Sequence, residues 1–289
     1  MVKRDLREIL ESSNDKLSVF ADKATLANCD NLTNEMLFSL IDNFLSDSQK
    51  VVLLNFEHFR NLNSQIRASI AMSISDSNLR LQLLLTPNGP LSDFKNYQIT
   101  DLVESLDDSC KLELLRSPGS IQNLKISKHS IVSIANSMSD DNKFSLLDNI
   151  DYVKEELKLD EYSISKILSS IDDEKSKLSL LNSIEMDSYY KANILLTLSD
   201  TAKASVLLNN VYGLKPYEFS QVLGSMDTDF LIDYFNKYPD FLAKNKLSFQ
   251  SVVKNLSPKK QVSFVNKMNE INLEERRKKK NFSHITSRY

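Results

Sequence analysis

Histidine and cysteine, the residues that most often serve as metal ligands or nucleophiles, are few and scattered in this chain. The histidines are His58, His129 and His284, and the cysteines are Cys29 and Cys110. No histidine lies within five residues of another histidine or of a cysteine, so the ligand spacing of zinc sites is missing. Two distant cysteines are typical of reduced thiols on helices and not of a disulfide framework. We therefore expect no metal site and no thiol chemistry.

Paired acids recur as Asp107-Asp108, Asp140-Asp141 and Asp172-Asp173. A catalytic carboxylate pair needs one unusual environment that separates two pKa values, whereas these pairs return at the same place in successive segments. Acids in the first turn of a helix are favoured by its dipole, so we interpret them as helix starts. Four scattered glycines cannot form a phosphate-binding loop. The sequence predicts no enzyme and no cofactor, although a site assembled from dispersed residues is an alternative that spacing leaves open.

A basic residue recurs four positions beyond a repeated Ser or Asp. The recurring basic residues are Lys16, Lys50, Arg80, Lys111, Lys143 and Lys177. Stacked repeats would align them, and Lys50, Lys111, Lys143 and Lys177 are then candidate contacts for an acidic partner. The favoured alternative is local pairing, because Asp or Glu stands three residues before each of these four lysines on the same helix face.

Tyrosine is distributed unevenly, with none of the ten before Tyr97. Six fall within three consecutive repeats, namely Tyr189, Tyr190, Tyr212, Tyr217, Tyr234 and Tyr238. Tyrosine is enriched at the centres of protein interfaces, so this segment is the first candidate for a protein-binding surface. Core packing of the same rings together with Phe219, Phe230, Phe235 and Phe241 is the favoured alternative.

These residues must be positioned by a repeated element: an apolar helical stretch, a Ser or Asp, a polar turn and a second apolar stretch. Residues 105–115 and 137–147 show the same order of residue classes. The small polar residue that opens each second helix recurs about every 27 to 34 residues, within the range of helical repeats. The expected openers are Ser12, Ser46, Asp76, Asp107, Ser139, Asp172 or Asp173, Asp200, Asp227 and Ser257. Their side-chain oxygens suit the free amides of a first helical turn.

The fold class follows from this repeat. With 41% hydrophobic residues, four Gly and six Pro, the chain has enough apolar material to fold but too few turns for a β-sandwich. One pair of helices cannot bury its apolar face alone, so neighbouring pairs must stack. We predict an all-α, elongated right-handed α-solenoid of about nine helical hairpins, with residues 1–273 as a single repeat domain.

The architecture resembles the HEAT-like and armadillo-like class of α-solenoids, without the landmark residues of a particular repeat family. The resemblance implies a protein-binding scaffold, and we expect a partner protein or peptide on its surface. The alternative is a nucleic-acid-binding repeat protein that uses the lysines and the basic polar tail, residues 274–289. A net charge of −3 makes that alternative the weaker one.

The sequence shows no secretion signal and no apolar run of 18 residues, so we expect a cytoplasmic protein without a membrane span. The composition is rich in Lys, Asn, Ser, Asp and Ile, which hints at an AT-rich genome. A bacterial protein, or an effector delivered into a host cell, is therefore a hypothesis about origin. The sequence names neither the partner nor the oligomeric state.

Overall fold

The computed structural model describes residues 5–29, 32–117, 119–238, 240–241, 249–267 and 269. Their regular structure is helical and these ranges contain no β-strand, which confirms the all-α prediction. The chain divides into two compact units, residues 1–163 and 164–289, with the boundary inside α15 (Glu161–Ser169). The single domain over residues 1–273 stays a prediction. The predicted tail, residues 274–289, lies outside the described residues.

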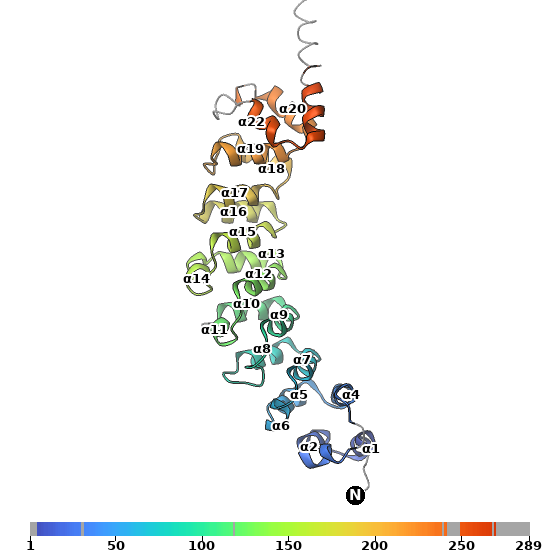
Figure 1. Cartoon of the computed structure of the whole chain (residues 1–289). Helices are drawn as coiled ribbons and strands as arrows, with labels where there is room; N and C mark the ends of the chain where they lie inside the picture. The colour runs from blue at the N-terminus through green and yellow to red at the C-terminus, as the bar shows by residue number, and fades with distance from the viewer. Residues whose placement is uncertain are drawn as a thin grey trace, which may run out of the picture. The chain divides into compact units, whose positions relative to one another are not determined.

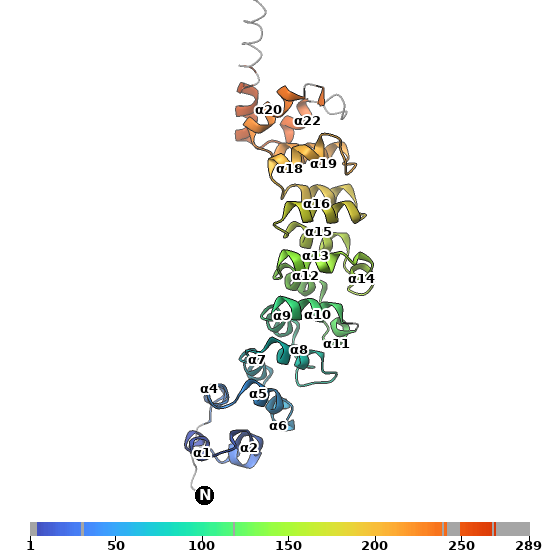
Figure 2. The same ribbon diagram turned by 180° about the vertical axis from the view of Figure 1, so that it is seen from behind.

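The first unit consists of pairs of short helices, each with a first and a second member (Figure 1, Figure 2). The first helices are α1 (Leu6–Ser12), α4 (Asn34–Phe44), α7 (Ser64–Met72), α9 (Asn96–Glu104) and α12 (Lys128–Asn136). The second helices are α2 (Lys16–Ala21), α5 (Asp47–Leu54), α8 (Ser77–Leu85), α10 (Asp108–Arg116) and α13 (Asp140–Leu147). Short helices follow some of them: α3 (Lys23–Ala27), α6 (Glu57–Arg60), α11 (Ser120–Asn123) and α14 (Ile150–Glu155).

In this unit, first helices pack against first helices and second helices pack against second helices. First helices contact first helices in the pairs α4–α7, α7–α9 and α9–α12, and second helices do so in the pairs α5–α8, α8–α10 and α10–α13. The apolar positions at three- and four-residue steps face these contacts, as the buried Ile131, Ile134 and Ala135 of α12 illustrate. Neighbouring pairs of this unit therefore contact each other through corresponding helices, and the solenoid arrangement of the chain stays a prediction.

The second unit contains α16 (Glu174–Ser183), α17 (Ser188–Leu195), α18 (Asp200–Leu207), α19 (Pro216–Ser225), α20 (Thr228–Lys237) and α22 (Phe249–Asn255). Residues 258–267 are also helical. In the same order of pairs, α17 and α19 are first helices here, and α16, α18 and α20 are second helices. Helices α17 and α19 pack together, and α19 packs against α22. That last contact is close, because a Cβ on Gly224 would lie 2.7 Å from the backbone oxygen of Asn255.

Most of the predicted helix openers cap second helices. Ser46 heads α5 in a capping box with Gln49, and the carboxylates of Asp76, Asp173 and Asp227 accept hydrogen bonds from first-turn amides. Asp107 and Ser139 head α10 and α13 without a side-chain cap bond, and Ser257 precedes the helical residues 258–267.

Two of the expected openers are wrong. Ser12 is the last residue of α1, and Asp15 caps α2 by accepting a hydrogen bond from the Ser18 amide at 3.1 Å. Asp200 is the first residue inside α18, and Ser199 is the cap, with its Oγ 3.3 Å from the Ala202 amide nitrogen. In both places several cap-competent residues stand close together, so residue type alone could not select the cap.

Candidate functional site

The structure places the four candidate lysines in the interior. Lys50, Lys111, Lys143 and Lys177 are only 3 to 5% exposed. Lys111 Nζ donates to the backbone oxygen of Ser137 and to Asp108 Oδ1, both at 3.2 Å. Their ammonium groups thus serve contacts inside the protein and are not displayed to a partner.

The same contact recurs along the chain. Lys50 Nζ lies 3.1 Å from the Ser73 oxygen, Arg80 donates to the Ser105 oxygen at 2.9 Å, and Lys177 Nζ lies 2.7 Å from Thr197 Oγ1. Ser73, Ser105 and Ser137 are the C-caps of α7, α9 and α12. Each cation therefore meets the C-terminal end of the first helix in the following pair, where the helix dipole favours positive charge.

The first-turn acids of the second helices complete this arrangement. Asp47 Oδ2 accepts from the amides of Ser75 and Asp76 at 2.8 and 3.0 Å, and Asp108 Oδ2 accepts from the Ser139 amide at 2.6 Å. Asp200 bonds the Asp227 amide in the same way at 2.7 Å. We call the basic residue and the acid three residues before it a hairpin clasp, because at Lys50 with Asp47 and at Lys111 with Asp108 both groups bind backbone of the next pair.

Within a clasp the two charges also pair. Nζ–Oδ1 distances are 3.2 Å for Lys111–Asp108, 3.4 Å for Lys143–Asp140 and 3.8 Å for Lys50–Asp47, so the predicted local pairing is present for these three lysines. Lys50 lies closer to Asp42 of its own pair, at 2.7 Å. Burial raises the pKa of Asp108, but the hydrogen bonds from Ser139 and Lys111 outweigh it, and the pKa lies below its usual value. The carboxylate thus stays ionised at neutral pH.

The candidate tyrosines separate into two groups. Tyr212 and Tyr234 are 8% and 7% exposed, and their hydroxyls donate to the backbone oxygens of Leu178 and Ala204, both at 3.2 Å. Burial raises the pKa of Tyr234 to about 12. These two rings belong to the core, as the alternative interpretation expected.

The remaining four tyrosines reach the surface to different degrees. Tyr189 and Tyr217 are 50% and 62% exposed, while Tyr190 and Tyr238 are half-buried. Tyr189 and Tyr190 stack edge to face with ring centroids 5.3 Å apart. The surface interpretation thus fits Tyr189 and Tyr217 best.

Tyr189 and Tyr217 share a position that sequence reasoning missed. Each is the second residue of a first helix, and the same position in α9, α12 and α15 holds another exposed aromatic ring. We call this set the aromatic row: Tyr97, His129 and Tyr162 in the first unit, and Tyr189 and Tyr217 in the second. Aligning the chain on first-helix starts, and not on second-helix caps, would have revealed it.

Contacts between neighbouring helix starts hold the members of the row near one another. Lys128 and Asp160, beside His129 and Tyr162, form an ion pair at 3.7 Å. In the second unit Lys215 pairs with Asp187 at 3.3 Å, next to Tyr217 and Tyr189. Packed helices have axes roughly 8 to 10 Å apart, so the starts of α9 and α12, and those of α17 and α19, lie about one helix diameter from each other.

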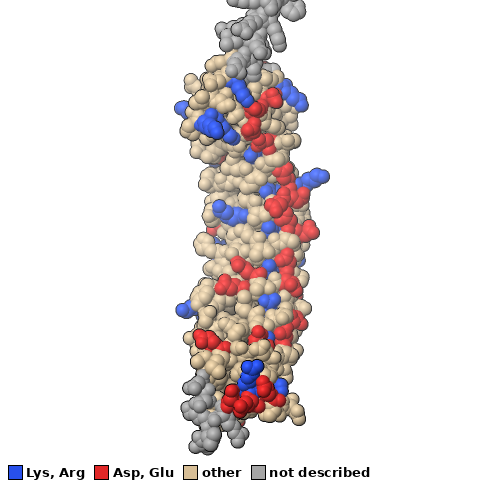
Figure 3. All heavy atoms as spheres, turned by 90° about the vertical axis from the view of Figure 1, so that its right-hand side faces the viewer, with Lys and Arg blue, Asp and Glu red and all other residues tan. Residues whose placement is uncertain are grey.

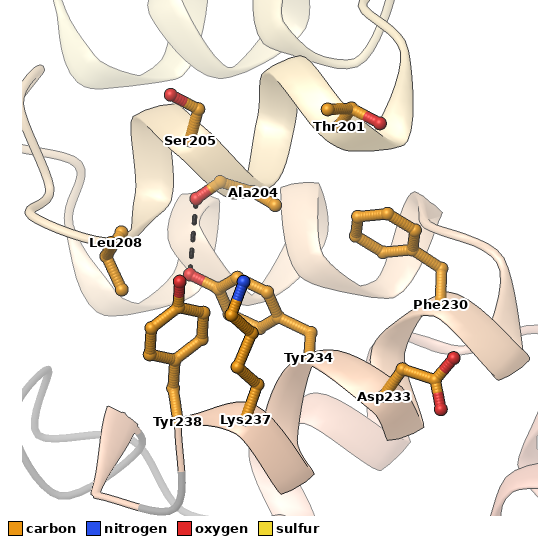
Figure 4. A pocket seen from close by; sticks show the side chains of 9 residues that line it. All are labelled: Thr201, Ala204, Ser205, Leu208, Phe230, Asp233, Tyr234, Lys237 and Tyr238. Carbon is orange, nitrogen blue, oxygen red and sulfur yellow. Dashed lines mark hydrogen bonds between the residues drawn. The ribbon is translucent and has the colours of Figure 1, made fainter.

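A pocket of about 360 Å³ lies between α18 and α20 in the second unit (Figure 4). Helix α20 supplies Phe230, Asp233, Tyr234 and Lys237, and Tyr238 follows at its end. The opposite wall comes from α18, with Thr201, Ala204, Ser205 and Leu208. The rings of Phe230 and Tyr234 are near parallel, with centroids 6.5 Å apart, and those of Tyr234 and Tyr238 are 5.0 Å apart.

A smaller hollow of about 270 Å³ lies between α4 and α7 in the first unit. Its lining includes Glu35 and Gln65, which occupy the second helical position that holds an aromatic ring in α9 and α12. The start of the first unit therefore presents amide and carboxylate groups where later pairs present rings.

Within the described parts of the chain, no three His, Cys, Asp or Glu side chains are arranged to hold a metal ion. Cys29 and Cys110 are both buried and unpaired as disulfides, and burial raises the pKa of each thiol. Every helix in these ranges is too short or too polar to span a bilayer.

Comparison of the chain with protein-family models, curated proteins and solved structures finds no match. The functional interpretation therefore depends on the geometry of the row and the pocket.

Proposed function

We propose that this chain is a non-enzymatic protein-interaction scaffold, an elongated right-handed α-solenoid of about nine helical hairpins that binds a partner protein or peptide. The observation that carries the proposal is the aromatic row. Isolated exposed rings are ordinary on protein surfaces, but recurrence at one helical position in successive pairs is not. Tyrosine supplies apolar area and a hydroxyl with few rotors to freeze, which suits an interface.

The charge around the row favours a protein over a nucleic acid. Lys128 and Lys215 beside the row are paired with Asp160 and Asp187. The clasp lysines are buried and offer little to a phosphate backbone, which needs accessible Lys and Arg. In Figure 3 the drawn face of each unit, taken by itself, carries Asp and Glu atoms as well as Lys and Arg atoms and shows no continuous basic surface.

The test is partner capture with the full chain and with Tyr189→Ala/Tyr217→Ala. Both rings are at least half exposed, so the variant is expected to fold normally by circular dichroism. We expect loss of most of the captured protein, because interface tyrosines often contribute about 2 kcal/mol or more. Val211→Ala is the matched control, since Val211 is 61% exposed in the same unit but outside the row.

Two results would refute the proposal. Unchanged capture by a folded double variant would remove the row from the interface. Captured nucleic acid whose binding falls steeply with salt would replace the protein partner by a phosphate backbone. The cytoplasmic or host-delivered location stays a prediction from composition.

A further inference from the structure

The pocket between α18 and α20 has a distinctive chemistry. Its walls are largely apolar and aromatic, and one ammonium group, that of Lys237, stands at the opening beside the Tyr238 ring, 5.4 Å from the ring centroid. In Figure 4 the Lys237 nitrogen and the Tyr238 hydroxyl point toward the α18 wall, whereas the Asp233 carboxylate points away from them.

Lys237 is an uncompensated charge at this site. Asp233 lies four residues earlier on α20, the spacing at which an ion pair commonly forms, yet Lys237 forms no ion pair with any residue in the described ranges. Its ammonium instead lies against an aromatic ring, a contact that leaves its hydrogen-bond donors free for an anion.

The size and openness of the pocket indicate a side chain as its occupant. A volume of about 360 Å³ is at the lower end of the range for ligand sites. The half-open shape covers a ring while leaving its attached backbone in solvent. The rings of Phe230, Tyr234 and Tyr238 line the pocket, and contact between aromatic rings adds to the gain from apolar burial.

We propose that this pocket binds a peptide segment in which a large aromatic side chain is flanked by a carboxylate, with the ring between Phe230, Tyr238 and the α18 wall and the carboxylate on Lys237. The aromatic part matches the lining and the carboxylate complements the unpaired ammonium. This inference rests on the proposed function, because it specifies the partner's chemistry at one pocket.

The chain contains no tryptophan, so the fluorescence of a tryptophan peptide reports its binding without background. The probe is the blocked peptide acetyl-Ser-Asp-Trp-Asp-Ser-amide, and its control is acetyl-Ser-Asn-Trp-Asn-Ser-amide, which has the same shape without charge. We expect the acidic peptide to bind the full chain at least about fivefold more tightly, the difference that one partly exposed charge-assisted contact supplies.

Two variants test the assignment of the site. Lys237→Met keeps the aliphatic stem and should weaken the acidic peptide about fivefold while leaving the neutral peptide unchanged. Tyr238→Ala should weaken both peptides. Lys175→Met removes an exposed lysine of the same unit and should change neither affinity.

Equal affinity for the two peptides, or an unchanged affinity in Lys237→Met, would overturn the inference. Tyr189→Ala/Tyr217→Ala leaves the pocket intact and should bind the peptide normally. If the acidic peptide fails to bind the wild-type chain, only the inference about the pocket fails. If the double variant still captures the partner unchanged, the proposed function fails.

Discussion

Replacing the buried Lys111 by methionine should destabilise the first unit by about 2 to 3 kcal/mol. Methionine preserves most of the apolar stem and removes the ammonium that bonds the Ser137 oxygen and Asp108 Oδ1. Hydrogen bonds to charged groups contribute about 1.5 to 3 kcal/mol each. Breaking a fully buried ion pair costs about 3 to 5 kcal/mol, but the Asp108 side chain is 33% exposed and water partly compensates it, which lowers the value.

The measurement is urea unfolding followed by circular dichroism, with the free energy taken from the midpoint and slope of the transition. Lys95→Met is the matched control in the same unit, because Lys95 is exposed and its loss should change stability by less than about 0.5 kcal/mol. Introducing Asp108→Asn into the wild type and into Lys111→Met completes a double-mutant cycle that isolates the Lys111–Asp108 interaction.

A Lys111→Met variant as stable as the Lys95→Met control would refute the clasp as a stabilising contact. A coupling energy near zero in the cycle would show instead that Lys111 acts through the Ser137 carbonyl alone. The reasoning requires both the loss of stability and a measurable coupling to Asp108.

Three further predictions concern single residues. Gly224→Ala should destabilise the second unit by about 1 to 3 kcal/mol in urea unfolding, since the added methyl meets the Asn255 backbone, and no effect would mean that the helices separate freely. Because the folded-state pKa of Tyr234 is raised to about 12, wild-type stability should fall between pH 10 and 12 more steeply than that of Tyr234→Phe. The hydrogen bond from Arg67 lowers the pKa of Asp93 in the folded state. The stability that this carboxylate contributes is therefore present above its unfolded pKa of 3.8 and is lost as the pH falls through the folded pKa. Asp93→Asn should make the free energy of unfolding less dependent on pH in this acid range.

The helical pairs were predictable because their signals are local. A small polar residue, first-turn acids and apolar residues at helical spacing specify a helix start and its buried face without long-range information. That is why Ser46, Asp107 and Ser139 were placed correctly. The failure at Asp200 has the same origin, since the adjacent Ser199 is an equally good cap by residue type and the local signal does not separate the two.

The roles of the basic residues were only half predictable. Spacing on one helix indicated the pairing of Lys111 with Asp108, but the bond to Ser137 joins groups 26 residues apart. Whether a recurring lysine faces solvent or a neighbouring helix end depends on how adjacent pairs stack, which one helix cannot show. The tyrosines divide for the same reason, with Tyr234 taken into the core by a carbonyl 30 residues earlier.

The clasp also bears on where recognition can occur. In the clasps of Lys50 and Lys111, the acid and the base of a second helix satisfy backbone groups of the next pair, so these charges are committed to holding the pairs together. Surface chemistry free for a partner must then come from other positions. The starts of the first helices meet this condition at Lys128–Asp160 and Lys215–Asp187, where the charges pair while the neighbouring rings of the aromatic row stay exposed. A surface of exposed rings among neutralised charges discriminates by shape and apolar contact more than by net charge, which is the physical basis for expecting a protein partner there.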